Sequence, residues 1–137
     1  MPTSIYNLQN KHALVTGGTH GIGLAIAKQL AEHGCKIAFL SRSSDKLKST
    51  CDFFDNMNAD YLSFQADVLS EKDCKSVMEQ IEEEWGRLDI LINNVGGGGR
   101  WGKENVESTD LDVWKEVHQK NAGASIFFTM KAIPLMR

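Results

Sequence analysis

Residues 12–23 read HALVTGGTHGIG, a short apolar run that breaks into glycines where helical periodicity begins. This order predicts a strand, a tight turn and the start of a helix. Such a turn directs unpaired backbone N–H groups and the positive end of a helix dipole into one small concavity, which suits a pyrophosphate. We therefore expect a dinucleotide-binding turn. The alternative is a plain strand-to-helix turn without a ligand.

The glycines of this turn are spaced G-x-x-x-G-x-G, at Gly17, Gly21 and Gly23, with Gly18 in addition. The spacing differs from the G-x-G-x-x-G of the common dinucleotide fingerprint, but the three glycine roles carry over. Gly17 permits the tight turn, and Gly21 lets the backbone approach a phosphate. Gly23 allows the helix to pack closely on the strand.

Length and composition favour one compact domain, residues 1–137. The chain is 42% hydrophobic and 24% charged, and no apolar stretch approaches the ~20 residues of a membrane span. The first ten residues lack a basic flank followed by an apolar core, so we expect a cytoplasmic protein without a membrane partner. A net charge of -3 with scattered lysines provides no basic stripe and excludes nucleic acid as the expected partner.

The three cysteines, Cys35, Cys51 and Cys74, are widely spaced and include no Cys-x-x-Cys pair. An odd, scattered set of this kind argues against a disulfide framework and against a zinc site. We interpret them as reduced packing residues and expect no metal.

Hydrophobic periodicity predicts strands at 13–16, 36–40, 61–65 and 88–94, each followed by a helix. The first helix places Ile22, Ile26 and Leu30 on one stripe. The expected helix caps are Ser43 or Ser44, Ser70 with Asp73, and Thr109 with Asp112, and the expected stops are Gly34 and Gly86. Alternating strands and helices predict a parallel sheet with right-handed crossovers. The expected fold is a Rossmann-type doubly wound α/β fold, truncated after the fourth strand and its following helix.

At this point the chain resembles the short-chain dehydrogenase/reductase family. Residues 16–23 match its T-G-x-x-x-G-x-G signature in full, and residues 93–96, Asn-Asn-Val-Gly, resemble its N-N-A-G. Asp67-Val68 resembles its adenine-contacting Asp-Val, and Asn121 its mid-helix Asn. These motifs occur along the whole chain in the order and at the spacing of the family. Within the family, the chain most resembles bacterial reductases of the 3-oxoacyl-carrier-protein and tropinone type. It implies an oxidoreductase that uses a nicotinamide cofactor.

The end of the second predicted strand, Ser41-Arg42-Ser43, indicates which nicotinamide cofactor is bound. An acid about 20 residues past the glycines would bind a ribose 2′-hydroxyl, whereas NADP needs a cation there. Arg42 can hold a 2′-phosphate with its planar fork, with His20 on the same side and serine hydroxyls nearby. We therefore expect NADP(H), with Thr19 and Ile22 of the glycine turn as further cofactor contacts. The alternative for Arg42 is a solvated side chain at a helix entrance.

The resemblance also implies the remaining cofactor contacts. Asp67 would receive the adenine amino group, and the N–H of Val68 would meet the ring, although Asp67 also suits a helix N-cap. Asn94 would steady the central turn of the sheet, and Gly96 would lie against the ribose. Val95 departs from the usual Ala and adds bulk near the adenosine without abolishing binding.

Asn121 is the candidate catalytic residue. It stands beside Ala122 and Gly123, and Asn and Gly cost about 0.7 to 1 kcal/mol each in a helix relative to Ala. The resemblance implies a local distortion of the helix, where the Asn holds a water in the proton relay to a catalytic Tyr and Lys. The alternative is an Asn tolerated for packing near Gly123. Nothing in the 137 residues matches the family's Ser and Tyr-x-x-x-Lys, because neither Tyr6 nor Tyr61 is followed four residues later by Lys.

The sequence thus predicts an NADP(H)-dependent oxidoreductase that transfers hydride between nicotinamide and a carbonyl or alcohol substrate. We expect the 137-residue chain alone to be inactive, as the cofactor-binding part of a longer reductase. The alternative is a truncated, non-catalytic NADP-binding or dimerising module. A methyltransferase would want an acid where Arg42 stands. In the family's strand order the fourth strand would be an apolar edge, so we also expect a homo-oligomer.

Overall fold

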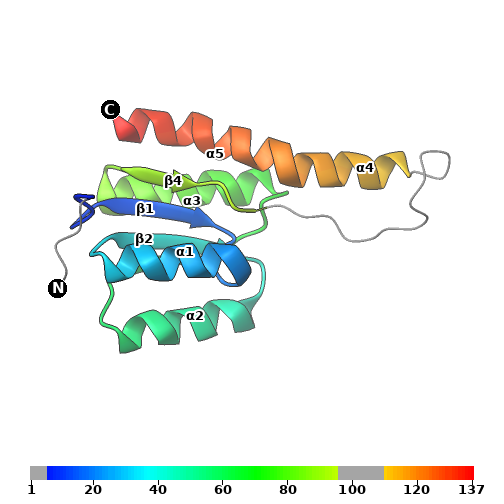
Figure 1. Cartoon of the computed structure of the whole chain (residues 1–137). Helices are drawn as coiled ribbons and strands as arrows, with labels where there is room; N and C mark the ends of the chain where they lie inside the picture. Colours follow the sequence, from blue (N-terminus) through cyan, green and yellow to red (C-terminus); the bar gives the residue numbers. More distant parts are fainter. Residues whose placement is uncertain (1–5, 96–109) are drawn as a thin grey trace.

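The computed structural model describes residues 6–95 and 110–137, whose four strands form one parallel sheet (Figure 1). The strands are β1 (His12–Thr16), β2 (Lys36–Ser41), β3 (Tyr61–Gln65) and β4 (Ile90–Ile92), in the spatial order β3-β2-β1-β4. In register, Leu14 of β1 lies between Ala38 of β2 and Leu91 of β4. This order reverses direction beside β1, which is the topology of a Rossmann-type sheet, and the predicted fold class is confirmed.

Helices cover both faces of the sheet (Figure 1). One face packs against α1 (Gly21–Glu32) and α2 (Ser44–Asn56), the other against α3 (Glu71–Trp85) and α5 (Ala124–Ala132). The last helical run is continuous in space but changes its winding. It consists of α4 (Leu111–His118), the π-helical turn η2 (Gln119–Gly123), α5, and the 3₁₀ turn η3 (Ile133–Met136).

Alternate residues of the central strands supply two separate cores. Val15 and Phe39 face α1 and α2, whereas Leu14 and Leu40 face α3 and α5, and all four are buried. A strand covered on both faces reads as a continuous apolar run, which is why residues 13–15 and 37–40 contain no polar side chain. The sheet is therefore fixed in place from both sides, and its carboxyl edge carries the glycine turn.

Side-chain caps fix where most helices begin. Ser43 caps α2, and Ser70 caps α3 by accepting a hydrogen bond from the Asp73 N–H at 3.2 Å. The predicted capping box is only half formed, because the Asp73 carboxylate accepts from the Asp67 N–H at 3.0 Å instead. The cap of α4 is Asp110 rather than Thr109, and its Oδ1 accepts from the Asp112 N–H at 2.9 Å.

Other sequence expectations need correction. β4 spans Ile90–Ile92 rather than 88–94 and is only half-buried, because no strand in the described part of the chain pairs with its outer edge. Ile22 does not join the apolar stripe of α1 and is 74% exposed. The buried face of α5 is formed by Ala124, Phe128 and Ala132.

The cysteines are free thiols, and Cys35 and Cys74 are buried. Burial raises the pKa of both thiols, to about 11 for Cys74, so the reactive thiolate is disfavoured. This agrees with a packing role. Among the described helices, none is long and apolar enough to cross a membrane.

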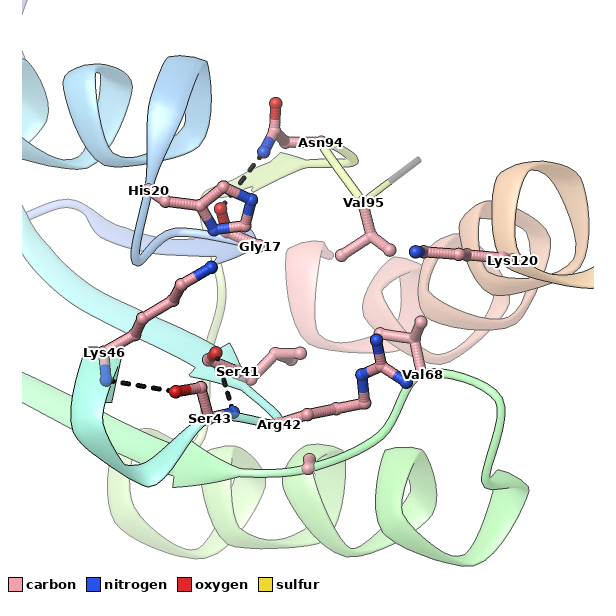
Figure 2. Close-up of a pocket in the computed structure, with 12 residues that line it drawn as sticks. Gly17, His20, Ser41, Arg42, Ser43, Lys46, Val68, Asn94, Val95 and Lys120 are labelled. Carbon is pink, nitrogen blue, oxygen red and sulfur yellow. Dashed lines mark hydrogen bonds between the residues drawn. The ribbon is translucent and has the colours of Figure 1, made fainter. Parts of the chain in front are cut away.

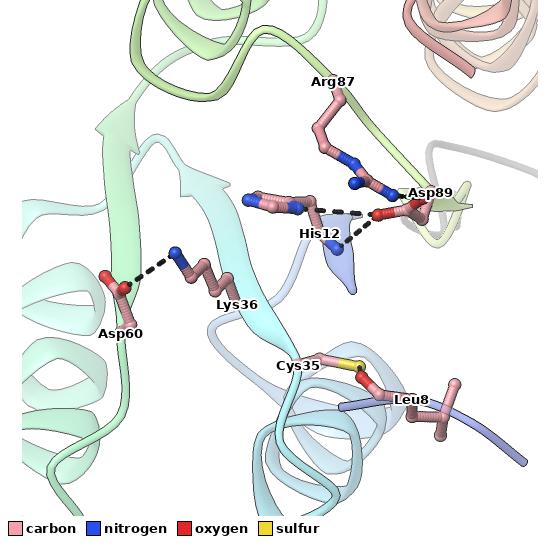
Figure 3. A network of polar contacts seen from close by, with 7 residues as sticks. All are labelled: Leu8, His12, Cys35, Lys36, Asp60, Arg87 and Asp89. Carbon is pink, nitrogen blue, oxygen red and sulfur yellow. Dashed lines mark hydrogen bonds and ion pairs between the residues drawn. The ribbon is translucent and has the colours of Figure 1, made fainter. Parts of the chain in front are cut away.

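A polar cluster at the other end of the sheet joins β1 to β4 (Figure 3). The His12 backbone N–H donates to Oδ2 of Asp89 at 2.9 Å, and Arg87 donates to Oδ1 at 2.6 Å. The His12 ring lies edge-on to Trp85, with its side chain only 12% exposed. This burial lowers the pKa of His12 below its ordinary 6.5, outweighing the attraction of the Asp89 carboxylate.

We expect the stability of the fold to decrease as the pH falls below about 6.5, in part through His12. Because its folded-state pKa is lowered, the unfolded chain binds the proton more readily, and the stability gained above pH 6.5 is lost as the pH falls through the folded pKa. Urea unfolding at pH 7.5 and pH 5.5 measures this loss. The His12→Asn variant should lose less stability between the two pH values, and equal losses in both proteins would contradict the assignment to His12.

Candidate functional site

The glycine turn leaves the first turn of α1 open toward the carboxyl edge of the sheet. Gly17 has a φ of 64° and Gly21 a φ of 54°, a left-handed backbone that favours glycine. His20, between them, is extended and makes no side-chain capping bond to the helix. The first turn of α1 also holds no acidic residue. Its N–H groups and the helix dipole are therefore available to an anion.

A single buried hydroxyl holds this turn against the end of β4. Oγ1 of Thr16 accepts hydrogen bonds from the N–H groups of Asn94 at 3.0 Å and Val95 at 3.2 Å, and it donates to the Ile92 carbonyl at 3.3 Å. Nδ2 of Asn94 donates to the Gly17 carbonyl at 3.2 Å. β1, the glycine turn and the segment after β4 thus form one connected edge.

The Thr16→Val variant should lose about 2–3 kcal/mol of stability, because two backbone N–H groups lose their acceptor in a buried place. Thr16→Ser keeps the hydroxyl and loses one methyl group, which should cost about 1 kcal/mol. Denaturant unfolding of the two variants compares the losses. If Val and Ser cost the same, the hydroxyl does not hold this edge.

A cavity of about 430 Å³ opens at the carboxyl ends of β1, β2 and β4 (Figure 2). It brings together many of the predicted cofactor residues from segments far apart in the sequence. Its lining is Gly17, His20, Leu40, Ser41, Arg42, Ser43, Lys46, Ala66, Val68, Asn94, Val95 and Lys120. In parallel α/β sheets this edge, beside the strand where the order reverses, is where ligands bind.

The charge of this lining has one sign. Arg42, Lys46 and Lys120 line the cavity with His20, and no carboxylate is among the lining residues. Within residues 6–95 and 110–137, none of these three cations forms an ion pair. Such a site favours a ligand with several negative charges.

Sequence reasoning missed two of these cations. Lys46 stands in the first turn of α2, the helix that begins two residues after Arg42, so its position near the end of β2 could have indicated it. Lys120 has no such signal, because it comes from the last helical run and reaches the cavity only through the tertiary fold.

Several predicted site residues lie outside this cavity. Thr19 is buried and faces a separate groove between α1 and α2. Gly23 lies beneath the Asn94 amide, and Gly21 and Ile22 are exposed at the start of α1. Asp67 lines an adjoining pocket of about 180 Å³, and its Oδ1 accepts from the Leu69 N–H at 2.9 Å. Gly96 lies outside the described residues.

Comparison with known proteins decides the family. The family model for short chain dehydrogenases matches residues 11–137. The chain belongs to the short-chain dehydrogenase family. A short chain dehydrogenase of Pseudocercospora fijiensis is 38% identical over 94% of this chain and 41% of its own length. A 7alpha-hydroxysteroid dehydrogenase of Bacteroides fragilis is 27% identical over 93% of this chain and 49% of its own. The chain therefore spans about half the length of these relatives.

Solved structures of other proteins share the fold. A Serratia marcescens short-chain dehydrogenase/reductase variant superposes with a TM-score of 0.87 at 29% identity, over 96% of this chain and 53% of its own. The L-sorbose reductase of Gluconobacter frateurii, solved with NADPH and L-sorbose, has a TM-score of 0.86 at 26% identity, over 96% of this chain and 50% of its own.

Asn121 lies in the π-helical turn η2, so the helix distortion implied by the resemblance is present. Its Nδ2 donates to the Val117 carbonyl at 2.8 Å, and Oγ of Ser125 donates to the Asn121 carbonyl at 3.4 Å. A π turn shifts the helix hydrogen bonds by one residue, and the Asn121 amide donates to a carbonyl of α4 just before this turn. The part of Asn121 in proton transfer stays a prediction.

Proposed function

We propose that residues 1–137 form the dinucleotide-binding domain of an NADP(H)-dependent short-chain reductase. Such an enzyme transfers hydride between the nicotinamide and a carbonyl or alcohol substrate. The observation that carries the proposal is the end of β2, where Arg42 stands between two serines in a cavity without carboxylates. An enzyme that grips the ribose hydroxyls of NAD would use an acid in this region.

The residues of the chain fit a dinucleotide in outline. The open first turn of α1 suits the pyrophosphate, because its N–H groups and dipole attract anions. Arg42 presents a planar fork to a 2′-phosphate, with Ser41 and Ser43 beside it. The Ser43 N–H donates to Oγ of Ser41 at 3.2 Å, which orients that hydroxyl within the cavity.

The bound nicotinamide would supply the hydride, and the chain supplies binding and orientation. Proton transfer needs a separate acid, and the 137 residues contain no Tyr-x-x-x-Lys. We therefore propose that this chain alone binds cofactor and does not turn over substrate.

Fluorescence titration of the purified protein with NADPH and NADH tests the cofactor proposal. NADPH should bind at least tenfold more tightly, and equal affinities or preference for NADH would overturn the preference for NADP(H). The intact mass of the natural protein, compared with 15.2 kDa, shows whether these residues are part of a longer chain. A heavier protein should oxidise NADPH with carbonyl substrates, whereas a 15.2 kDa protein should not.

A second candidate function is a non-catalytic module that self-associates. The observation that favours it is the exposure of large apolar side chains along α4 and α5, since Leu111, Trp114, Ile126 and Met130 are 55–69% exposed. Sedimentation velocity over a range of protein concentrations tests this candidate. A single monomeric species throughout would count against self-association.

A further inference from the structure

The cavity has two walls of different chemistry (Figure 2). On one side, His20 and Lys46 present nitrogen atoms near the glycine turn. On the other side, Val68 and Val95 present methyl groups, and the Arg42 guanidinium lies beside Val68. A nucleotide has the same division, because its phosphates need charged donors and its flat base needs an apolar slot. The two walls therefore indicate which part of a dinucleotide lies where.

Lys120 stands at the apolar wall. In Figure 2 its side chain extends from the helix and points its Nζ toward Val95, away from the helix that carries it. The side chain is half-buried, and no carboxylate in residues 6–95 and 110–137 pairs with it. Lys120 also lines the adjoining pocket with Arg42, Asp67 and Glu116. It is therefore a three-proton donor beside the methyl groups of Val95.

Lys120 lies within the π-helical turn η2, directly before Asn121. It lines the adjoining pocket together with Glu116, which stands one helical turn earlier on α4. The candidate catalytic Asn121 and Lys120 are therefore neighbours in the last helical run.

We propose that Lys120 recognises the adenine base. Its ammonium donates to a ring nitrogen of a base that lies along Val68 and Val95, while the 2′-phosphate lies at the end of β2, between Arg42 and Lys46. The ring nitrogens of adenine are acceptors, and burying them without a donor is unfavourable. This inference rests on the proposed dinucleotide function and adds a base-specificity residue to it.

Two variants distinguish the contributions of the two walls to cofactor affinity. Lys120→Met keeps the aliphatic stem and removes the ammonium, and Lys46→Met does the same on the polar wall. Kd values for NADPH and NADH come from fluorescence titration of each purified variant. Since both cofactors contain adenine, Lys120→Met should weaken NADPH and NADH by the same factor, about tenfold. Lys46→Met should weaken NADPH alone. Lys115→Met removes the same charge from an exposed position on α4, outside the lining, and should leave both Kd values unchanged.

Other results would overturn the assignment. If Lys120→Met weakens NADPH alone, its ammonium serves the 2′-phosphate and not the base. If it changes neither Kd, the side chain takes no part in binding. If the unaltered protein binds neither cofactor, the proposed function fails together with this inference. If the unaltered protein binds both cofactors and Lys120→Met leaves both Kd values unchanged, only the inference is overturned.

Discussion

Gly23→Ala should destabilise the protein by about 3 kcal/mol or more, the upper end of the usual cost of overpacking. An added Cβ would lie 2.3 Å from the Gly17 carbonyl oxygen and 2.3 Å from Nδ2 of Asn94. The first of these is a backbone atom inside the glycine turn, so it cannot swing away as a side chain does. The helix must then separate from the strand, and since whole domains are stable by about 5–15 kcal/mol, a substantial unfolded fraction is expected. Thermal unfolding with soluble yield measures the effect.

Gly21→Ala is the matched control, two residues earlier in the same turn. A Cβ there would meet nothing within 4 Å, so the only cost is the left-handed backbone, about 1–2 kcal/mol. Gly23→Ala should therefore melt well below Gly21→Ala. Should the two variants melt together, the close approach of α1 to the Gly17 turn does not limit the fold.

The fold was predictable from the sequence because its signals are local and repeated. The apolar runs at 13–15 and 37–40 are covered on both faces, and Ser43 and Ser70 cap the helices that follow β2 and β3. These patterns depend on neighbouring residues, and tertiary contacts only reinforce them. β4 shows the limit of such local signals. The apolar run around Ile90 predicts a longer strand that is buried on both faces. In the structure β4 pairs only with β1 among the described residues, and it is shorter than predicted and half-buried.

The candidate site was predictable only where a motif carried it. Gly17, Arg42 and Asn94 meet at one cavity, as their positions at strand ends indicate. Lys120 could not be found this way, because it reaches the cavity only through the packing of the last helical run over the sheet. Thr16 was visible as part of the signature, but its three hydrogen bonds depend on the end of β4 and the two residues Asn94 and Val95 beyond it, nearly eighty residues away.

Arg42→Met should convert the preference of the protein from NADPH toward NADH. Arg42 is exposed at the end of β2, lines the cavity and makes no ion pair within the described part of the chain, so its guanidinium is available to a ligand. A hydrogen bond to a charged group contributes about 1.5–3 kcal/mol, which corresponds to a loss of about 10- to 100-fold in NADPH affinity. NADH lacks the 2′-phosphate, so its affinity should hardly change. Fluorescence titration of both cofactors measures the ratio of the two Kd values.

Salt dependence distinguishes a direct contact from a general loss of charge. Lys48→Met removes one positive charge from the exposed side of α2, outside the cavity lining, and should leave the Kd ratio as it is. In the unaltered protein, raising the ionic strength should weaken NADPH more than NADH, and Arg42→Met should lose most of this difference, because the screened charge pair is then absent. If Arg42→Met and Lys48→Met lower NADPH affinity alike, Arg42 acts through the overall field of the surface. In that case the cation that holds the 2′-phosphate is to be sought on the polar wall, at Lys46.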